Sequence, residues 1–147
     1  MDYRSEYERW LKHANADIKA ELEKYDDAQI EDSFYRNLAF GTGGLRGVIG
    51  SGTNRMNVHP VAKASQGLAN YLVAKYGDKA SVAIGYDSRI KSDVFAKTAA
   101  GVFAANGIKV FIWPRLLPVP TVSYAVRYLK TSAGVMLTAS HNPSKYN

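Results

Sequence analysis

The chain has 147 residues, the usual size of one domain, with 46% hydrophobic residues, 22% charged residues and no cysteine. This composition excludes disordered, collagen-like and disulfide-scaffold proteins, and the lack of cysteine excludes thiol catalysis and sulfur-ligated zinc. No segment approaches the roughly 18 consecutive apolar residues of a membrane span. The N-terminus also lacks the apolar run of a signal peptide. We therefore expect a cytoplasmic protein with no membrane partner.

The net charge of +6 is unevenly distributed along the chain. Residues 1–40 carry 6 basic and 10 acidic side chains, whereas residues 41–147 carry 13 basic and 3 acidic ones. We accordingly divide the chain into an N-terminal helical segment, 1–40, and a basic body, 41–147. A basic body favours an anionic partner, either a nucleic acid, a phosphorylated metabolite or the acidic remainder of a longer polypeptide. Charge alone does not rank these, and a solvated basic face with no partner is equally open.

The acidic segment is predicted to be helical. Apolar side chains recur every three or four residues over 3–25, which predicts one amphipathic helix. A short second helix is expected over 32–38, with Asp32 or Ser33 as its cap. Six of the twelve glycines then fall within residues 41–52, a density that predicts a loop and hairpin.

The basic body alternates between helical and strand patterns. A helix is expected from Pro60, which suits a first turn, to a stop at Gly77. The patterns that follow are a buried strand at 81–86, a helix at 93–105 capped by Ser92 and closed by Asn106-Gly107, a buried strand at 108–113, a helix at 121–130 and a strand at 134–137. Short strands joined by helices predict an α/β fold with a mainly parallel sheet, whose ligands gather at the carboxyl ends of the strands.

Two polar loops follow strands of this predicted sheet, and we expect them at the same edge. Asp87-Ser88-Arg89 follows the first strand, and Ser140-His141-Asn142-Pro143 follows the last. Ser140 is a candidate nucleophile or phosphate acceptor, and His141 can donate a hydrogen bond to an oxyanion. The alternative is that Ser140 and Asn142 merely cap the strand end beside a surface histidine. The sequence lacks the G-x-S-x-G pattern of acyl-transfer enzymes.

The glycine-rich segment, 41–47, surrounds one arginine. Main-chain N–H groups and the Arg46 guanidinium can together approach phosphate oxygens. The segment matches neither of the common nucleotide-binding glycine patterns, so a plain hairpin is equally favoured. For Asp87 and Arg89, we favour a structural role, in which the pair braces a neighbouring loop, over a catalytic one.

Metal binding and nucleic-acid binding find little support in the residues. A hard divalent ion requires several carboxylate or phosphate oxygens, and the body contains three aspartates and no glutamate. A phosphorylated Ser140 would supply one oxygen ligand, and the others would come from outside this chain. Aromatic residues do not interleave with a Lys/Arg stripe, and no nucleic-acid recognition motif is present.

Four motifs occur here in a recognisable order: FGTGGLRG, GYDSR, PVPT and TASHNP. In this order they resemble the first domain of the α-D-phosphohexomutases, and FGTGGLRGVIGSGTNRMN resembles most the phosphoglucomutase and phosphopentomutase-like branch. The resemblance implies a three-layer α/β/α domain over residues 41–147 within a longer, four-domain chain. It also implies that this sequence is an N-terminal piece that stops inside the active-site serine loop.

The resemblance further implies a mechanism. Ser140 would be carried as a phosphoserine with Mg²⁺, would phosphorylate a sugar monophosphate, and would be rephosphorylated by the sugar bisphosphate intermediate, which also serves as activator. Glucose 1-phosphate and glucose 6-phosphate would then interconvert. Arg46 would clamp the transferred group and His141 would donate to it or handle a proton, while Thr42, Gly43, Arg46 and Asn142 would contact the substrate.

Two hypotheses therefore remain. In the first, the chain is part of an intramolecular phosphotransferase, and its partners are the sugar phosphate and the remaining domains. The chain alone is then inactive, because those domains supply the other metal ligands and the sugar-recognition loop. In the alternative, it is a basic α/β module that binds nucleic acid or a partner protein, and Ser140 is never phosphorylated.

Overall fold

A computed structural model describes residues 2–147, which form two compact units. One unit runs to Pro60 and includes Tyr146, and the other comprises Val61–Lys145 and Asn147. The glycine-rich segment thus belongs with the N-terminal helices, whereas the division at residues 40 and 41 that charge suggests stays a prediction.

The first unit begins with two helices, α1 (Tyr3–His13) and α2 (Ala16–Leu22), so the prediction of one helix over 3–25 is wrong. The chain is extended at Ala14 and Asn15, with ψ of 161° and 162°, and this bend separates the helices. The apolar positions are nevertheless buried or partly buried on both sides of the bend. The periodic pattern therefore identified the buried face correctly but not the break.

Helix α3 (Asp27–Phe34) starts earlier than predicted and is capped by Asp26. Asp26 accepts a hydrogen bond from the Gln29 main chain, and the Gln29 side chain accepts one from the Asp26 main chain. This reciprocal capping box satisfies two N–H groups that a helix end otherwise leaves unpaired. Asp32 and Ser33 lie inside the helix, so the prediction that they are its caps is wrong.

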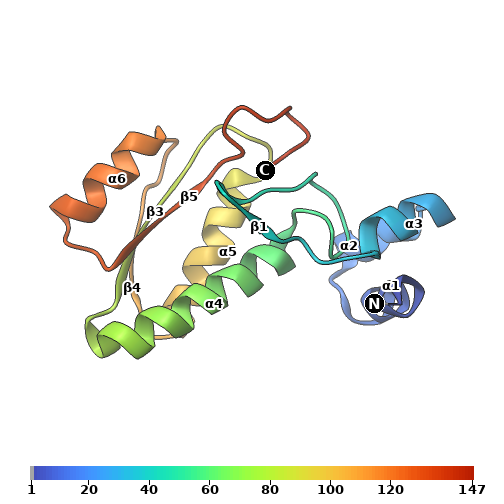
Figure 1. The fold of residues 1–147 in the computed structure, drawn as a ribbon, viewed down its shortest axis with the longest axis horizontal. Helices are drawn as coiled ribbons and strands as arrows, with labels where there is room; N and C mark the ends of the chain where they lie inside the picture. The colour runs from blue at the N-terminus through green and yellow to red at the C-terminus, as the bar shows by residue number, and fades with distance from the viewer. Residues whose placement is uncertain (1) are drawn as a thin grey trace. The chain divides into compact units, whose positions relative to one another are not determined.

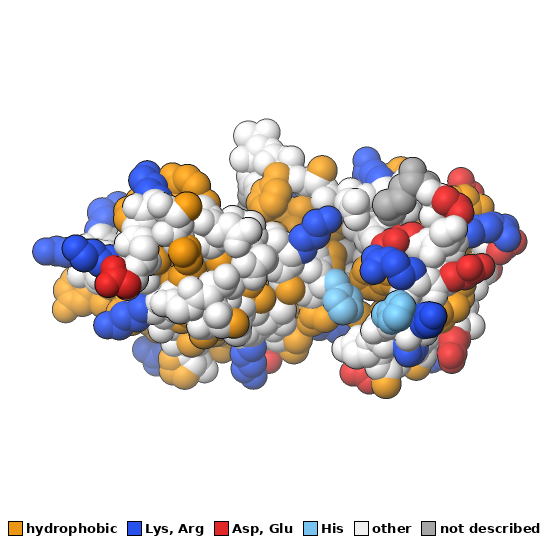
Figure 2. Space-filling model, turned by 90° about the horizontal axis from the view of Figure 1, so that it is seen from below, with side chains coloured by type: hydrophobic (Ala, Val, Ile, Leu, Met, Phe, Trp, Pro, Cys, Tyr) orange, Lys and Arg blue, Asp and Glu red, His pale blue; other side chains and the backbone are white. Residues whose placement is uncertain are grey.

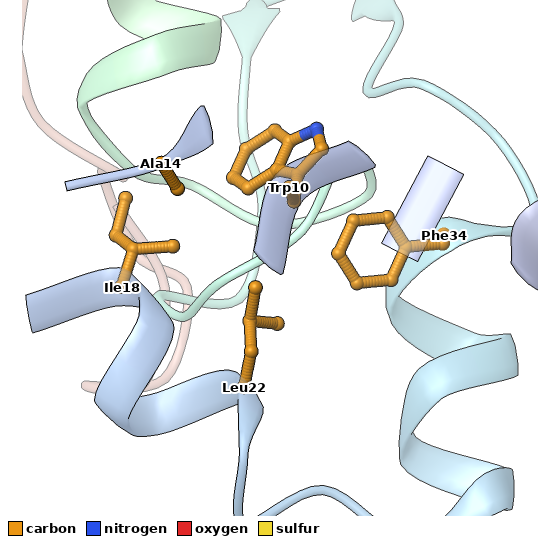
Figure 3. Close-up of a cluster of buried hydrophobic side chains, with 5 residues drawn as sticks. All are labelled: Trp10, Ala14, Ile18, Leu22 and Phe34. Carbon is orange, nitrogen blue, oxygen red and sulfur yellow. The ribbon is translucent and has the colours of Figure 1, made fainter. Parts of the chain in front are cut away.

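The three helices surround a small aromatic core, shown in Figure 3. Phe34 is fully buried, and the Trp10 ring lies 5.6 Å from it in an edge-to-face arrangement. Tyr7 makes a similar contact with Phe34 at 5.8 Å. The five buried members of this cluster are Trp10, Ala14, Ile18, Leu22 and Phe34.

The predicted glycine-rich hairpin is confirmed. Strands β1 (Phe40–Gly41) and β2 (Gly44–Leu45) pair antiparallel. The segment that follows has little regular structure, and side chains hold it. Asn57 donates to the carbonyl oxygens of Gly50 and Gly52, both at 2.9 Å, and Asn54 donates to that of Asp32 at 3.0 Å.

At Gly52, this segment comes close to the main chain of Ser33. The φ of Gly52 is +129°, and a Cβ there would lie 2.5 Å from the Ser33 carbonyl oxygen. Only glycine meets both conditions without strain.

Helix α4 (Val58–Tyr76) follows, with Pro60 in its first turn as predicted. It ends at Gly77, whose φ is +56°, and a 3₁₀ turn, η1 (Gly77–Lys79), leads to the sheet. Within residues 2–147, no helix has both the length and the apolar character to cross a membrane.

The second unit contains a parallel sheet, as predicted, with the strand order β4-β3-β5. Its strands are β3 (Ser81–Tyr86), β4 (Lys109–Ile112) and β5 (Ala133–Leu137). Helix α5 (Ser92–Ala105) lies on the same side of the sheet as α4, and α6 (Val119–Tyr128) covers the other side (Figure 1). The fold is therefore the expected three-layer α/β/α arrangement.

Small residues on the sheet allow α6 to pack closely. A Cβ at Gly85 of β3 would lie 2.5 Å from Val122, and one at Gly134 of β5 would lie 2.6 Å from Val126. On the opposite face, Val82 and Ile84 are fully buried. Parallel strands covered on both faces are apolar throughout, which is why the 81–86 segment could be predicted.

Three details of this unit differ from prediction. The N-cap of α5 is Lys91, with φ of +62°, and the Ser92 hydroxyl donates to Asp87 instead. Strand β4 is only partly buried because it lies at an edge of the sheet. Helix α6 starts at Val119 because Pro118 and Pro120 favour the first turn of a helix.

Candidate functional site

The two polar loops do meet at one edge of the sheet. Strands β3 and β5 are parallel neighbours, and Asp87 and Ser140 follow their carboxyl ends. The main-chain N–H of Asp87 donates to the carbonyl oxygen of Leu137, the last residue of β5, at 3.2 Å. The prediction of a shared edge is therefore confirmed.

Ser140 occupies an exposed, tight turn directly after the buried Ala139. Its φ is +55°, a left-handed conformation that is uncommon for a residue with a side chain. The main-chain N–H of Ser140 donates to Thr138 Oγ1, and that of Asn142 donates to the Ala139 carbonyl oxygen, both at 3.0 Å. Left-handed residues of this kind occur often at functional sites.

His141 lies beside the Ser140 hydroxyl. The His141 Nδ1 atom is 3.3 Å from Ser140 Oγ, within hydrogen-bond distance. The ring nitrogen accepts the hydroxyl proton in one tautomer and donates its own in the other. The hydrogen bond between the two side chains can therefore run in either direction.

The Arg89 guanidinium contacts the serine loop through main-chain oxygens. It donates to the carbonyl oxygens of Ser140 at 2.6 Å, Asn142 at 2.7 Å and Pro143 at 3.1 Å. Its Nε is 3.7 Å from the Asp87 carboxylate. These contacts are what loop bracing requires, and they orient three loop carbonyls toward one cation.

Two further residues, Ser92 and Asn147, contact this network, and sequence reasoning missed their position. Ser92 is fully buried and Asn147 is 3% exposed. Asn147 Nδ2 lies 2.8 Å from Ser92 Oγ, which in turn lies 2.9 Å from Asp87 Oδ1. Residue type suggested a helix-cap role for Ser92 and none for Asn147, and no spacing rule distinguishes a buried asparagine from an exposed one.

The other predicted substrate residues belong to the first unit. Thr42 and Gly43 form the exposed turn between β1 and β2, and Arg46 follows β2. The Arg46 guanidinium folds back over the turn, with Nη2 3.5 Å from the Gly43 carbonyl oxygen. A Cβ at Gly43 would lie 2.5 Å from that nitrogen, so this glycine makes room for the arginine. The joint action of Arg46 and Ser140 stays a prediction.

The described residues do not fit a complete metal site. Among residues 2–147, no cluster of three or more histidine or acidic side chains could hold a metal ion. The carboxylate at the sheet edge, Asp87, already accepts hydrogen bonds from the Arg89 main chain and the Ser92 hydroxyl.

A separate hollow of about 260 Å³ lies in the first unit, among Arg9, Trp10, His13, Ala14 and His59. Figure 2 shows histidine side chains beside it. Partial burial, and then the charge of Arg9, lower the pKa of His59 below its usual value of 6.5. The neutral imidazole is therefore favoured there, packed edge-on against Trp10 at 4.9 Å.

Comparisons with known proteins agree on a family. Residues 37–147 match the family model for the phosphoglucomutase/phosphomannomutase alpha/beta/alpha domain I. The chain is 46% identical over 132 residues to a probable phosphoribomutase of Schizosaccharomyces pombe, covering 88% of this chain and 22% of that protein. It is 41% identical over 143 residues to a phosphoglucomutase of Staphylococcus haemolyticus, covering 95% and 26%.

A solved structure is also similar. The crystal structure of a putative phosphomannomutase from Thermus thermophilus matches 76% of this chain and 24% of its own, with a TM-score of 0.69 and 35% identity. The fold and the family model together define an α/β/α domain I of the phosphoglucomutase/phosphomannomutase type. The chain belongs to the phosphoglucomutase/phosphomannomutase family, and it spans about a quarter of the length of the curated relatives it matches.

Proposed function

We propose that this chain is the part of a phosphosugar mutase that carries the transferred phosphoryl group, on Ser140. One observation carries the proposal: an exposed serine hydroxyl stands at a left-handed turn at the carboxyl end of β5. Arg89 holds the carbonyl oxygens of this turn, which would otherwise repel a phosphate. Family membership supports the same assignment.

The proposed transfer conserves atoms and protons. The bond between phosphorus and Ser140 Oγ breaks, and a bond between phosphorus and a free hydroxyl of the sugar monophosphate forms. The proton of that hydroxyl ends on Ser140 Oγ, and His141 Nδ1, 3.3 Å away, is near enough to hold it in passage. The resulting bisphosphate turns round, and its other phosphoryl group returns to Ser140.

The remaining predicted residues would bind rather than react. Arg46 presents a planar pair of N–H donors, which suits the oxygens of a transferring phosphoryl group. Thr42, Gly43 and Asn142 would contact the sugar phosphate. Mg²⁺ would have one ligand here, the phosphate on Ser140, with the others supplied by further domains.

The substrate we propose is glucose 1-phosphate, in exchange with glucose 6-phosphate, in a cytoplasmic enzyme. The relatives are a phosphoglucomutase and a probable phosphoribomutase, and the similar structure is that of a putative phosphomannomutase. Because the sugar differs among these names, the test should compare glucose, mannose and ribose phosphates. The chain alone, without further domains, should turn over none of them.

The decisive experiment replaces Ser140 in the complete mutase that carries this chain. We expect Ser140→Ala to abolish the phosphate mass increment and nearly all turnover, because alanine has no oxygen to phosphorylate. Ser144→Ala, four residues along the same exposed loop, is the matched control and should keep both. A Ser140→Ala protein that is still phosphorylated, or still turns over normally, would exclude the proposal.

Arg46→Lys separates the phosphate carrier from the clamp. Lysine keeps the charge but loses the planar fork, so we expect Ser140 to remain phosphorylated while transfer slows by roughly 10- to 100-fold. Intact-mass measurement and steady-state kinetics report the two results. Unchanged kinetics would remove Arg46 from the transfer step.

A further inference from the structure

We propose that the segment Ser140–Asn147, called the serine loop below, is held at both of its ends by one hydrogen-bond network, and that Ser92 and Asn147 are positioning residues for Ser140. Arg89 holds the start of the loop at residues 140–143, and Ser92 holds its far end through the Asn147 side chain. Asp87 joins the two points of attachment. The kinetic part of this proposal rests on the proposed function, whereas its structural part does not.

The far end of the loop is fixed by a buried amide. Asn147 Nδ2 donates to Ser92 Oγ at 2.8 Å and to the Ile90 carbonyl oxygen at 3.1 Å. Both hydrogens of this amide are thus used, and the side chain is almost fully shielded from water. Because a buried donor without partners is costly, the pairing strongly favours this position of Asn147.

Chemistry fixes the direction of the hydrogen bonds in the network. A serine hydroxyl has one hydrogen, and the ionised Asp87 carboxylate can only accept. Ser92 therefore donates to Asp87 Oδ1, at 2.9 Å, and must accept from Asn147. Replacement of the Asn147 amide by a carboxylate would place an acceptor against an acceptor.

Asp87 connects the far end to the near end. Its Oδ1 also accepts from the Arg89 main chain at 3.0 Å, and its Oδ2 lies 3.7 Å from Arg89 Nε. Arg89 in turn donates to the carbonyl oxygens of residues 140, 142 and 143. The loop from Ser140 to Asn147 is therefore attached at both ends to the single turn between β3 and α5.

This double attachment matters because Ser140 has a left-handed backbone. Such a conformation persists only where its surroundings impose it. A misplacement of about 1 Å at a reacting group can slow a reaction by roughly 100-fold. Loss of the far attachment should thus disturb the Ser140 hydroxyl without removing any group that touches the substrate.

The structural test also uses the complete mutase, with hydrogen exchange followed in the segment that corresponds to this chain. In Asn147→Asp, which preserves size and removes the donor, we expect amide hydrogen exchange over residues 139–142 and 144–146 to accelerate by roughly 10- to 100-fold, the equivalent of one buried hydrogen bond. Asn70→Asp is the control, since it adds the same charge at an exposed site where the oxygen is already the acceptor for Gln66. Exchange in β3 should not change in either variant. Unchanged loop exchange in Asn147→Asp would overturn the proposal, whatever the activity.

A second variant covers the case in which Asn147→Asp does not fold. Ser92→Ala removes the relay oxygen but adds no charge, and it should accelerate exchange at both ends of the loop. Acceleration at neither end would overturn the network.

The kinetic test uses the complete mutase. Asn147→Asp should lower kcat by roughly 10- to 100-fold with little change in KM, because Asn147 does not contact the substrate, and Ser140 should still become phosphorylated. The new carboxyl regains a donor when protonated, so the deficit should shrink as pH falls toward about 4. If hydrogen exchange in the loop accelerates in Asn147→Asp but kcat does not change, Asn147 has no positioning role for Ser140. Absence of phosphoserine in the unsubstituted enzyme would instead overturn the proposed function and leave the exchange result standing.

Discussion

The two units keep their irregular segments in place by different means. In the first unit, the loop between β2 and α4 is held by isolated main-chain hydrogen bonds, such as that from Met56 N–H to the Val48 carbonyl oxygen at 2.8 Å, and by side chains that donate to main-chain carbonyls, above all Asn57 and Asn54. In the second, three parallel strands share a regular ladder of main-chain hydrogen bonds, and side-chain hydrogen bonds gather in the loops at the strand ends. Removal of one side-chain hydrogen bond should therefore lower the free energy of unfolding more in the first unit than in the sheet, where many main-chain hydrogen bonds remain.

Gly52→Ala should break the first unit most severely. The new Cβ would meet the Ser33 carbonyl oxygen at 2.5 Å, and alanine would have to adopt φ of +129°. We expect the free energy of unfolding to fall by about 3–5 kcal/mol. Each unit contains one of the two tryptophans, so urea unfolding in a Trp113→Phe background reports the first unit through Trp10.

The control for Gly52 is Gly67→Ala. Gly67 lies in α4, where a Cβ has no heavy atom within 4 Å. Alanine favours a helix over glycine, so this change should stabilise the second unit by up to about 1 kcal/mol, as read through Trp113 in a Trp10→Phe background. Equal effects of the two substitutions would contradict the close approach at Ser33.

Asn57→Ala should have the next largest effect. It leaves the buried carbonyl oxygens of Gly50 and Gly52 without this donor, and we expect a loss of about 2–4 kcal/mol. Ser132→Ala is the matching change in the sheet unit, where the serine hydroxyl accepts from the Ser81 main chain at 3.2 Å. That substitution should cost about 1 kcal/mol or less. A larger loss for Ser132 than for Asn57 in urea titrations would reverse the contrast between the units.

Tyr25→Phe should change how stability depends on pH, and this pH-dependent effect appears only in alkali. Burial, and then the Glu21 carboxylate, raise the pKa of Tyr25 from 10.0 to about 12. The folded state therefore retains a proton that the unfolded state loses, so stability is complete below pH 10 and falls as pH rises through about 12. The Tyr25→Phe protein should lose less stability than the parent over this interval, as measured by urea midpoints and phenolate absorbance.

A matched control is Tyr128→Phe, since Tyr128 is 72% exposed. Its alkaline stability profile should follow that of the parent. An identical profile for Tyr25→Phe would mean that the phenol is not shielded as the structure indicates.

The sheet is predictable from sequence because its information is local. A buried parallel strand has a continuous apolar run, and the polar residues that follow such strands must meet at one edge. That reasoning is sufficient to place Asp87 and Ser140 together from the order of the strands along the chain.

The missed features depend on contacts between distant residues or on small local preferences. Asp26 and Asp32 are both acceptable helix caps by residue type, and only the reciprocal partner Gln29 decides between them. Residue type predicts Ser92 as a helix cap, but in the structure its hydroxyl pairs with Asp87 and with Asn147, which lies 55 positions further along the chain. The resemblance to a family supplied the chemistry of Ser140, which residue types alone left open.

The edge position of β4 has a consequence for association between copies of the protein. An edge strand offers unpaired main-chain groups to a strand of another molecule, which is a common route to aggregation. Strand β4 is only four residues long, begins with a lysine whose ammonium lies 5.0 Å from the centre of the Phe111 ring, and is soon followed by Pro114, which has no N–H to donate. A second copy that paired along this edge would have to bury the Lys109 charge and would lose a hydrogen bond at the proline. We therefore expect the sheet to resist extension from molecule to molecule at β4.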